Sequence, residues 1–193
     1  MRIDPNRAPD DQKLQELILF IALRSSNDER FGSIKLNKLL FFSDFLAYAK
    51  LGRSITGHGY QRLPNGPAPK KMLPVLRQMS ENNSLCMAER DYYGRSQKIP
   101  IALREPHLDS FSAEEIAIVT DVIEGLKRKN AKGISSLSHK FPGWKLAREG
   151  EIIPYEVALA IFAKPRQQDI KNTLSMKEEL AALRREADFS DAD

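Results

Sequence analysis

The stretch SIKLNKLLFFSDFLAYAK, residues 33–50, decides the fold, because apolar side chains cover most of the circumference of the helix that it predicts. A helix that is apolar on nearly all sides is packed from several directions, so we expect it at the centre of the fold. Ser33 is the predicted N-cap and Gly52 the predicted stop signal. A narrow stripe of the stretch is polar and is expected to face water: Lys35, Asn37, Lys38 and Asp44.

Shorter elements are predicted on both sides of this central helix. Apolar residues at helical spacing predict further helices at about 10–26, 70–82, 112–129 and 133–139, and one from 152 onward. Ser112 and Glu115 form a capping box at the start of one of them. The last helix is expected to begin at Ile152 and Ile153 and to bury Val157, Leu159 and Ile161.

Two alternating segments, 85–92 and 99–103, predict a β-hairpin. The expected fold is therefore α+β and predominantly helical. It consists of a compact helical domain over residues 1–163 with the small hairpin, and an appended charged tail over 164–193. One amphipathic helix is predicted in the tail, with Leu180 and Leu183 on its apolar face.

The composition is that of a globular protein and excludes several classes. The chain has 193 residues, 41% of them hydrophobic, and a formal net charge of +4. Residues 1–105 hold 17 Lys and Arg against 11 Asp and Glu, and residues 106–193 hold 13 against 15. This split favours two surfaces with different partners, although counting noise and the acidic chain end explain it equally well.

Membrane and disulfide-rich classes do not fit the sequence. The first residues lack the apolar core of a signal peptide, and the longest apolar run, Leu17 to Leu23, is far too short to span a membrane. Cys86 is the single cysteine, which excludes an internal disulfide, and we expect it to be a small buried residue of a strand. A soluble, cytoplasmic protein without a membrane partner is expected.

The common catalytic patterns are also missing. The chain has no GxxxxGK[ST], GxSxG or HExxH segment, and His58, His107 and His139 are far apart in sequence. We therefore predict a protein that is not an enzyme, with no catalytic residue, no cofactor and no metal ligand.

Nucleic acid is a lesser alternative partner. The densest basic cluster, residues 127–129 with Lys132, would suit a winged-helix-like DNA-binding regulator. The same cluster is explained by its place at the end of a helix, where the dipole favours cations.

Several segments resemble one family in the right order. KLNKLLFFSDF, residues 35–45, is similar to the KLQKLLYFA-type signature of the SocA-like, or Panacea, antitoxin domain and of related phage-associated proteins. The similarity continues with Gly52, Tyr60, the Gly66-Pro67 pair, SLSHKFPGW at 136–144 and IIPYE at 152–156. Together these segments cover about residues 12–163, while Ala68-Pro69 and the long hairpin depart from the family pattern.

The resemblance implies a bacterial or phage toxin–antitoxin role. Such a domain binds and neutralises a cognate toxin protein, and in the type example it also hands the toxin to an ATP-dependent protease as a proteolytic adaptor. The resemblance implies neither catalysis nor a cofactor.

Nine residues are candidates for partner binding: Tyr60, Gly66, Pro67, Lys70, Lys71, His139, Trp144, Leu180 and Leu183. Trp144 is either an anchor for the partner or a plug that closes the core between two helices. The Gly-Pro pair and His139 also have structural interpretations, and the paired lysines can simply serve solubility. The tail helix either folds on the partner or is a solvated chain end.

Overall fold

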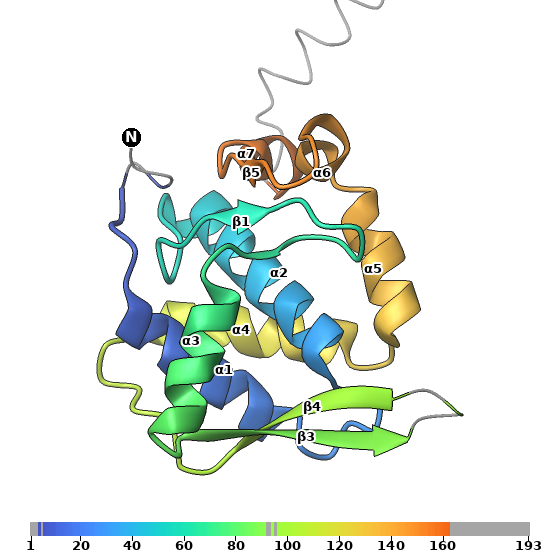
Figure 1. The fold of residues 1–193 in the computed structure, drawn as a ribbon. Coiled ribbons are helices and arrows are strands. Elements are labelled where there is room, and N and C mark those ends of the chain that lie inside the picture. Colours follow the sequence, from blue (N-terminus) through green and yellow to red (C-terminus); the bar gives the residue numbers. More distant parts are fainter. Residues whose placement is uncertain (1–3, 5, 92–93, 95, 163–193) are drawn as a thin grey trace, which may run out of the picture. The chain divides into compact units, whose positions relative to one another are not determined.

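The computed structural model describes residues 4, 6–91, 94 and 96–162, and its fold is α+β and predominantly helical, as predicted (Figure 1). The predicted tail helix, with Leu180 and Leu183, lies outside the described residues. The helices are α1 (Asp11–Arg24), α2 (Ser33–Leu51), α3 (Met72–Glu81), α4 (Ala113–Leu126), α5 (Ala131–His139), α6 (Pro142–Leu146) and α7 (Val157–Phe162). The strands are β1 (Tyr60–Gln61), β2 (Ala68–Pro69), β3 (Leu85–Asp91), β4 (Ser96–Ala102) and β5 (Ile152–Ile153).

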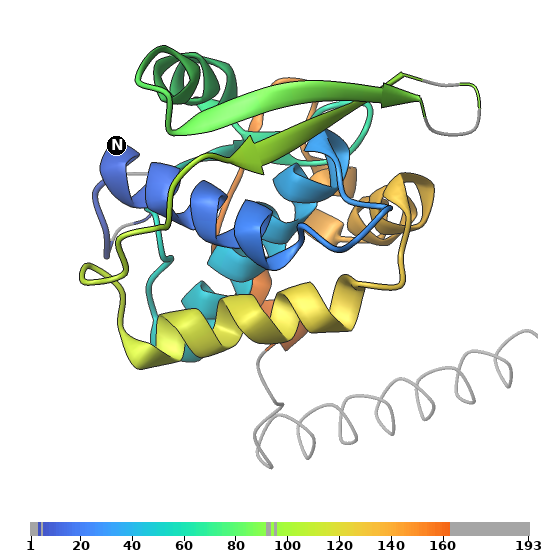
Figure 2. The same ribbon diagram turned by 90° about the horizontal axis from the view of Figure 1, so that it is seen from below.

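Helix α2 lies at the centre of the fold, which confirms the prediction from its apolar circumference. It contacts α1, α4, α5 and α7, and Figure 2 shows it between the β3–β4 hairpin and α4. Most of its apolar side chains are buried, and an aromatic cluster forms around the rings of Phe41 and Phe45, whose centroids are 4.3 Å apart. Gly52 ends the helix with a φ of 74°, a left-handed conformation that suits glycine.

The polar stripe of α2 does not face water, contrary to the expectation above. Lys35, Lys38 and Asp44 are buried, because the helix is covered on that side too. Lys35 Nζ lies 2.6 Å from Asp28 Oδ2 and also donates to the carbonyls of Lys127 and Lys129. A buried charge needs such partners, so the stripe ties α2 to its neighbours instead of exposing it.

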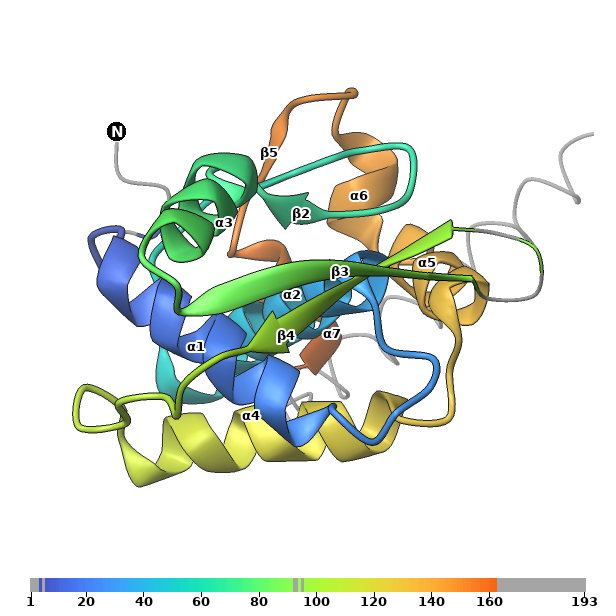
Figure 3. The same ribbon diagram turned by 60° about the horizontal axis from the view of Figure 1, so that its bottom comes forward.

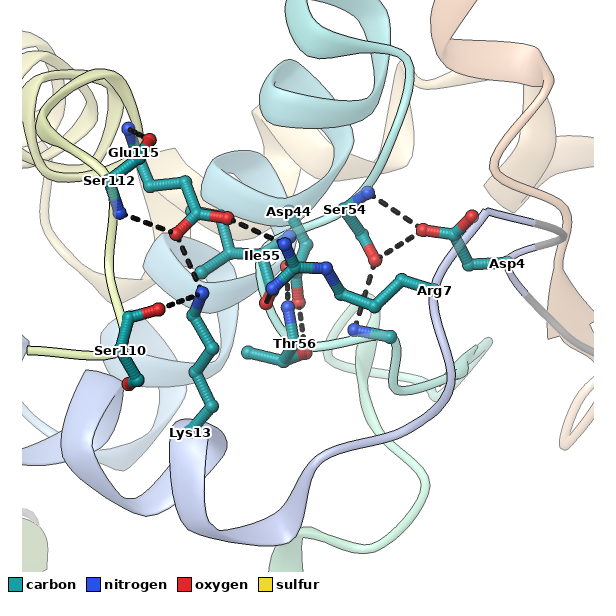
Figure 4. Close-up of polar contacts among 11 residues, drawn as sticks. Asp4, Arg7, Lys13, Asp44, Ser54, Ile55, Thr56, Ser110, Ser112 and Glu115 are labelled. Carbon is teal, nitrogen blue, oxygen red and sulfur yellow. Dashed lines mark hydrogen bonds and ion pairs between the residues drawn. The ribbon is translucent and has the colours of Figure 1, made fainter.

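Asp44 is the most saturated of these buried groups. It accepts hydrogen bonds from the backbone N–H groups of Ile55 (2.7 Å) and Thr56 (2.9 Å), from the Thr56 hydroxyl and from the Tyr60 hydroxyl (2.7 Å). Burial raises the pKa of Asp44, and the four donors oppose that shift. Figure 4 shows how this carboxylate holds the loop that follows α2.

A second buried carboxylate fixes the start of α4. Ser112 and Glu115 make the predicted capping box. Glu115 also forms ion pairs with Lys13 Nζ (2.7 Å) and with Arg7 (3.0 Å), as Figure 4 shows. Glu115 therefore joins the start of α4 to Lys13 of α1 and to Arg7, which precedes α1.

Two small antiparallel sheets complete the fold. The predicted hairpin forms, with β3 pairing β4 from Leu85↔Ala102 to Asp91↔Ser96. The other sheet has the order β2-β1-β5. Residues Ile152 and Ile153 pair with β1 and do not begin a helix, which corrects the prediction for this segment. Helix α7 begins only at Val157, where Leu159 and Ile161 are exposed instead of buried.

Two smaller predictions were also wrong. The N-cap of α2 is Gly32, and the Ser33 hydroxyl donates instead to the carbonyl of Lys98 on β4. Cys86 is exposed, because side chains alternate along β3 and its neighbour Leu85 takes the inward position. Among the described residues, no helix has the length and apolar character that a membrane span requires.

Candidate partner-binding site

The loop between β1 and β2, residues 62–67, is the centre of the candidate site, and we call it the Gly-Pro loop. Three helices each donate one side-chain hydrogen bond to a carbonyl of this loop. Lys38 Nζ of α2 donates to Pro67 O (3.1 Å) and Ser135 Oγ of α5 to Asn65 O (3.1 Å). Trp144 Nε1 of α6 donates to Leu63 O (3.2 Å). Figure 3 shows the loop reaching over α6.

Gly66 is required at its position for two reasons. Its φ of 93° lies where residues with a side chain are strained. A Cβ at this position would collide with Ser138 Oγ and would stand 2.6 Å from Lys38 Cε. The Gly-Pro pair thus shapes the turn and also allows the loop to approach α2 and α5 closely.

Lys38 is an unusual support for this loop. Its side chain is 1% exposed, and no carboxylate among the described residues forms an ion pair with it. Burial lowers the pKa of Lys38 to about 7. Near neutral pH the amine is therefore balanced between its charged and neutral forms, and Pro67 O accepts a hydrogen bond from either.

An aromatic stack lies beside the loop. The rings of His139 and Trp144 are stacked with their centroids 4.0 Å apart. The Arg62 guanidinium carbon lies 4.4 Å from the Trp144 ring, and the Arg62 Nη1 donates to Ala147 O. Burial, followed by the nearby charges of Lys38 and Arg62, lowers the pKa of His139, while a hydrogen bond with the backbone of Pro64 acts in the opposite direction. The net shift favours the neutral form of the imidazole.

The last residue of α6 is an exposed leucine. Leu146, two residues after Trp144 on α6, is 82% exposed. Trp144 itself is half-buried, since its indole rests on the loop and on His139. We name Arg62, His139, Trp144 and Leu146 the loop–α6 surface. It combines fixed aromatic and guanidinium groups with an exposed apolar side chain, the composition typical of binding hot spots.

The structure thus brings together Gly66, Pro67, His139 and Trp144 from the predicted set. It places the other described candidates elsewhere. Tyr60 is fully buried, with its hydroxyl on Asp44, so its side chain lies in the core. Lys70 and Lys71 are exposed at the start of α3, which lies across α2 from α5 in Figures 1 and 3. Lys71 is 3.4 Å from Asp11 there.

Sequence reasoning missed the supports of the site. Arg62, Ser135 and Ser138 gave no pattern signal, because their roles depend on a loop that is distant in sequence. Lys38 did give one: a lysine within an otherwise apolar central helix must either reach water or find a buried partner. Among the described residues, no group of three His, Cys, Asp or Glu side chains could hold a metal ion.

Comparison with known proteins identifies the family. The family model "Antitoxin SocA-like, Panacea domain" matches residues 36–145, more than half of the chain. This segment runs from α2 to α6 and includes Lys38, Gly66, Pro67 and Trp144. No curated protein and no solved structure matches the chain significantly. The chain therefore belongs to the family of SocA-like antitoxins with a Panacea domain.

Proposed function

We propose that this chain is a non-catalytic antitoxin that binds a cognate toxin protein and neutralises it in the cytoplasm. Membership of the SocA-like antitoxin family is the observation that carries the proposal. A binding role of this kind needs a rigid surface and no reactive pocket.

The loop–α6 surface is the proposed contact with the toxin. Three hydrogen bonds from separate helices hold the Gly-Pro loop, so binding would cost little additional ordering of the backbone. Tryptophan and arginine are enriched among the residues that dominate binding energy, and both are present here. Leu146 offers apolar area that the fold itself leaves uncovered.

Co-expression tests the proposal. The gene beside this one is expressed alone and together with the antitoxin, and growth and co-purification are measured. Neutralisation should be lost with Leu146→Asp on α6 and kept with Leu73→Asp on α3. The second variant is a matched control because Leu73 is 79% exposed and belongs to α3, which lies apart from α6 in Figures 1 and 3. A neighbouring product that is harmless alone would contradict the proposal.

A finer proposal is that the chain acts as a proteolytic adaptor, as the type example of the family does. The half-life of the toxin is measured with a purified ATP-dependent protease, with and without this chain. A shorter half-life in the presence of the chain supports the adaptor role. An unchanged half-life removes that role and leaves neutralisation by binding.

A further inference from the structure

A second surface feature is a groove of about 770 Å³, formed where α2, β4 and α5 begin. We call it the basic groove. Four cationic residues line it, the exposed Arg30, Lys98 and Lys132 and the buried Lys35, and none of its lining residues is Asp or Glu. Ile34 and Ala131 contribute apolar surface to the same hollow. It lies at the start of α5, whereas the loop–α6 surface includes His139 at the other end of that helix.

Arg30, Lys98 and Lys132 are not held in ion pairs by the part of the fold that the structure describes. All three side chains are exposed, and none forms an ion pair with a carboxylate of the described residues. Lys35, which also lines the groove, differs because Asp28 neutralises its ammonium. The positive charge of the groove therefore comes from side chains that are free to meet an external anion.

We propose that the basic groove binds an acidic segment of a protein partner. The occupant follows from charge complementarity: three unpaired cations around a partly apolar hollow suit carboxylates interspersed with apolar side chains. That the partner is a protein rests on the proposed antitoxin function. The charge of the groove deepens that proposal by stating the chemistry of the segment that the partner presents.

A nucleic acid fits the surroundings of the groove less well. No aromatic side chain is among the residues that line it, so it offers no platform on which bases could stack. The neighbouring hollow, which shares Arg30, is lined by Asp28, Glu29 and Glu124 as well as by cations. These carboxylates would repel a phosphate backbone that continued beyond the groove.

Fluorescence anisotropy with the full chain tests this inference without any toxin. The probe is a short fluorescein-labelled peptide of alternating Glu and Leu. The groove variant is R30E/K98E/K132E, and the control is K50E/R53E/R77E, which reverses three exposed cations outside the groove. We expect roughly a tenfold or greater loss of affinity in the groove variant and little change in the control. Circular dichroism verifies that both variants are folded.

Two results would overturn the inference. Equal affinities of the two variants would mean that any binding is non-specific attraction to net charge. Tighter binding of a labelled single-stranded oligonucleotide than of the peptide, with loss in the groove variant, would assign the groove to nucleic acid. The proposed antitoxin function fails separately, when the neighbouring gene product proves harmless or is not neutralised by the unmodified chain.

Discussion

Lys38 Nζ donates a hydrogen bond across 3.1 Å to the carbonyl of Pro67 and so joins the central helix to the Gly-Pro loop. This bond unites the two segments that carry the strongest family resemblance, KLNKLLFFSDF and the Gly66-Pro67 pair. The lysine is buried and its pKa is lowered to about 7, so the side chain that supports the candidate site changes its charge near neutral pH.

The stability of the protein is expected to increase as the pH rises from 7 to 10 because of Lys38. Burial lowers the pKa of Lys38 from 10.5 in the unfolded chain to about 7 in the folded one. Between these values the unfolded state binds the extra proton, so raising the pH favours folding by up to about 1.4 kcal/mol per unit. Below pH 7 Lys38 is protonated in both the folded and the unfolded chain, so the free-energy cost of burying its charge no longer changes with pH.

Lys38→Met tests this pH dependence by urea denaturation. The variant removes the titrating group at similar volume, although it leaves Pro67 O without its donor. Its stability relative to the unmodified protein should be highest at pH 7 and below and should fall by a few kcal/mol toward pH 10. A difference that does not change with pH would show that Lys38 does not titrate in this range.

Gly66→Ala is expected to destabilise the protein by about 2–4 kcal/mol and to weaken toxin binding, because it combines backbone strain with a collision. Gly150→Ala is the matched control. Gly150 has a similar φ of 80°, but a Cβ there would meet nothing within 4 Å. The control should cost only about 1–2 kcal/mol, the strain of the left-handed conformation alone. If Gly66→Ala and Gly150→Ala lower the stability equally in thermal unfolding, the close approach of the loop to α2 and α5 is not a reason for glycine at position 66.

Tyr60→Phe is expected to destabilise the fold by about 1–3 kcal/mol, because it removes one of the four donors of the buried Asp44 carboxylate. Burial already raises the pKa of Asp44, so the loss of a donor raises it further. Tyr48→Phe is the control, since the Tyr48 ring is also buried and stacks on Tyr155 while no hydrogen bond of its hydroxyl is part of the described network. If denaturation gives both variants the same stability, the Asp44 network is not a major support.

Trp144 is expected to be both a support and a contact, so two substitutions separate these roles. Trp144→Phe keeps an aromatic ring but removes the hydrogen bond to Leu63 O, and it should lower stability by about 1 kcal/mol while retaining most of the binding. Trp144→Ala should cost about 3 kcal/mol or more, since it also leaves a cavity beside His139. Melting temperature and toxin affinity are measured for both. Unchanged toxin affinity in a folded Trp144→Ala variant would assign Trp144 to structural support alone.

The sequence was sufficient to predict the elements that depend on local chemistry. The apolar circumference of residues 33–50 predicted a central helix, and Ser112 with Glu115 predicted where α4 begins. Each signal is confined to one short segment of the chain, so it can be recognised without knowledge of the rest of the fold.

The errors arose where the partner is distant in sequence. Lys38 and Asp44 were expected to face water because a charged residue on a helix usually does, but their partners Pro67 and Tyr60 lie beyond the helix. Ile153 joins a strand because Tyr60 offers a pairing edge, which periodicity near residue 153 does not reveal.

The candidate site was predictable only in part for the same reason. Gly66, Pro67, His139 and Trp144 were selected by residue type and family resemblance, and they converge on the same loop. Arg62 and Leu146 were missed. Their importance comes from the Trp144 stack and from exposure, which are properties of the folded chain.

Toxin neutralisation by the Leu146→Asp and Leu73→Asp variants tests the central claim most directly. Both leucines are about equally exposed, so each change should leave the melting temperature nearly unaltered. The account predicts that cells expressing the neighbouring toxin survive with Leu73→Asp and stop growing with Leu146→Asp, whose affinity for the toxin falls roughly tenfold or more. Full protection by both variants, with unchanged toxin affinity, would contradict the assignment of the loop–α6 surface as the toxin contact.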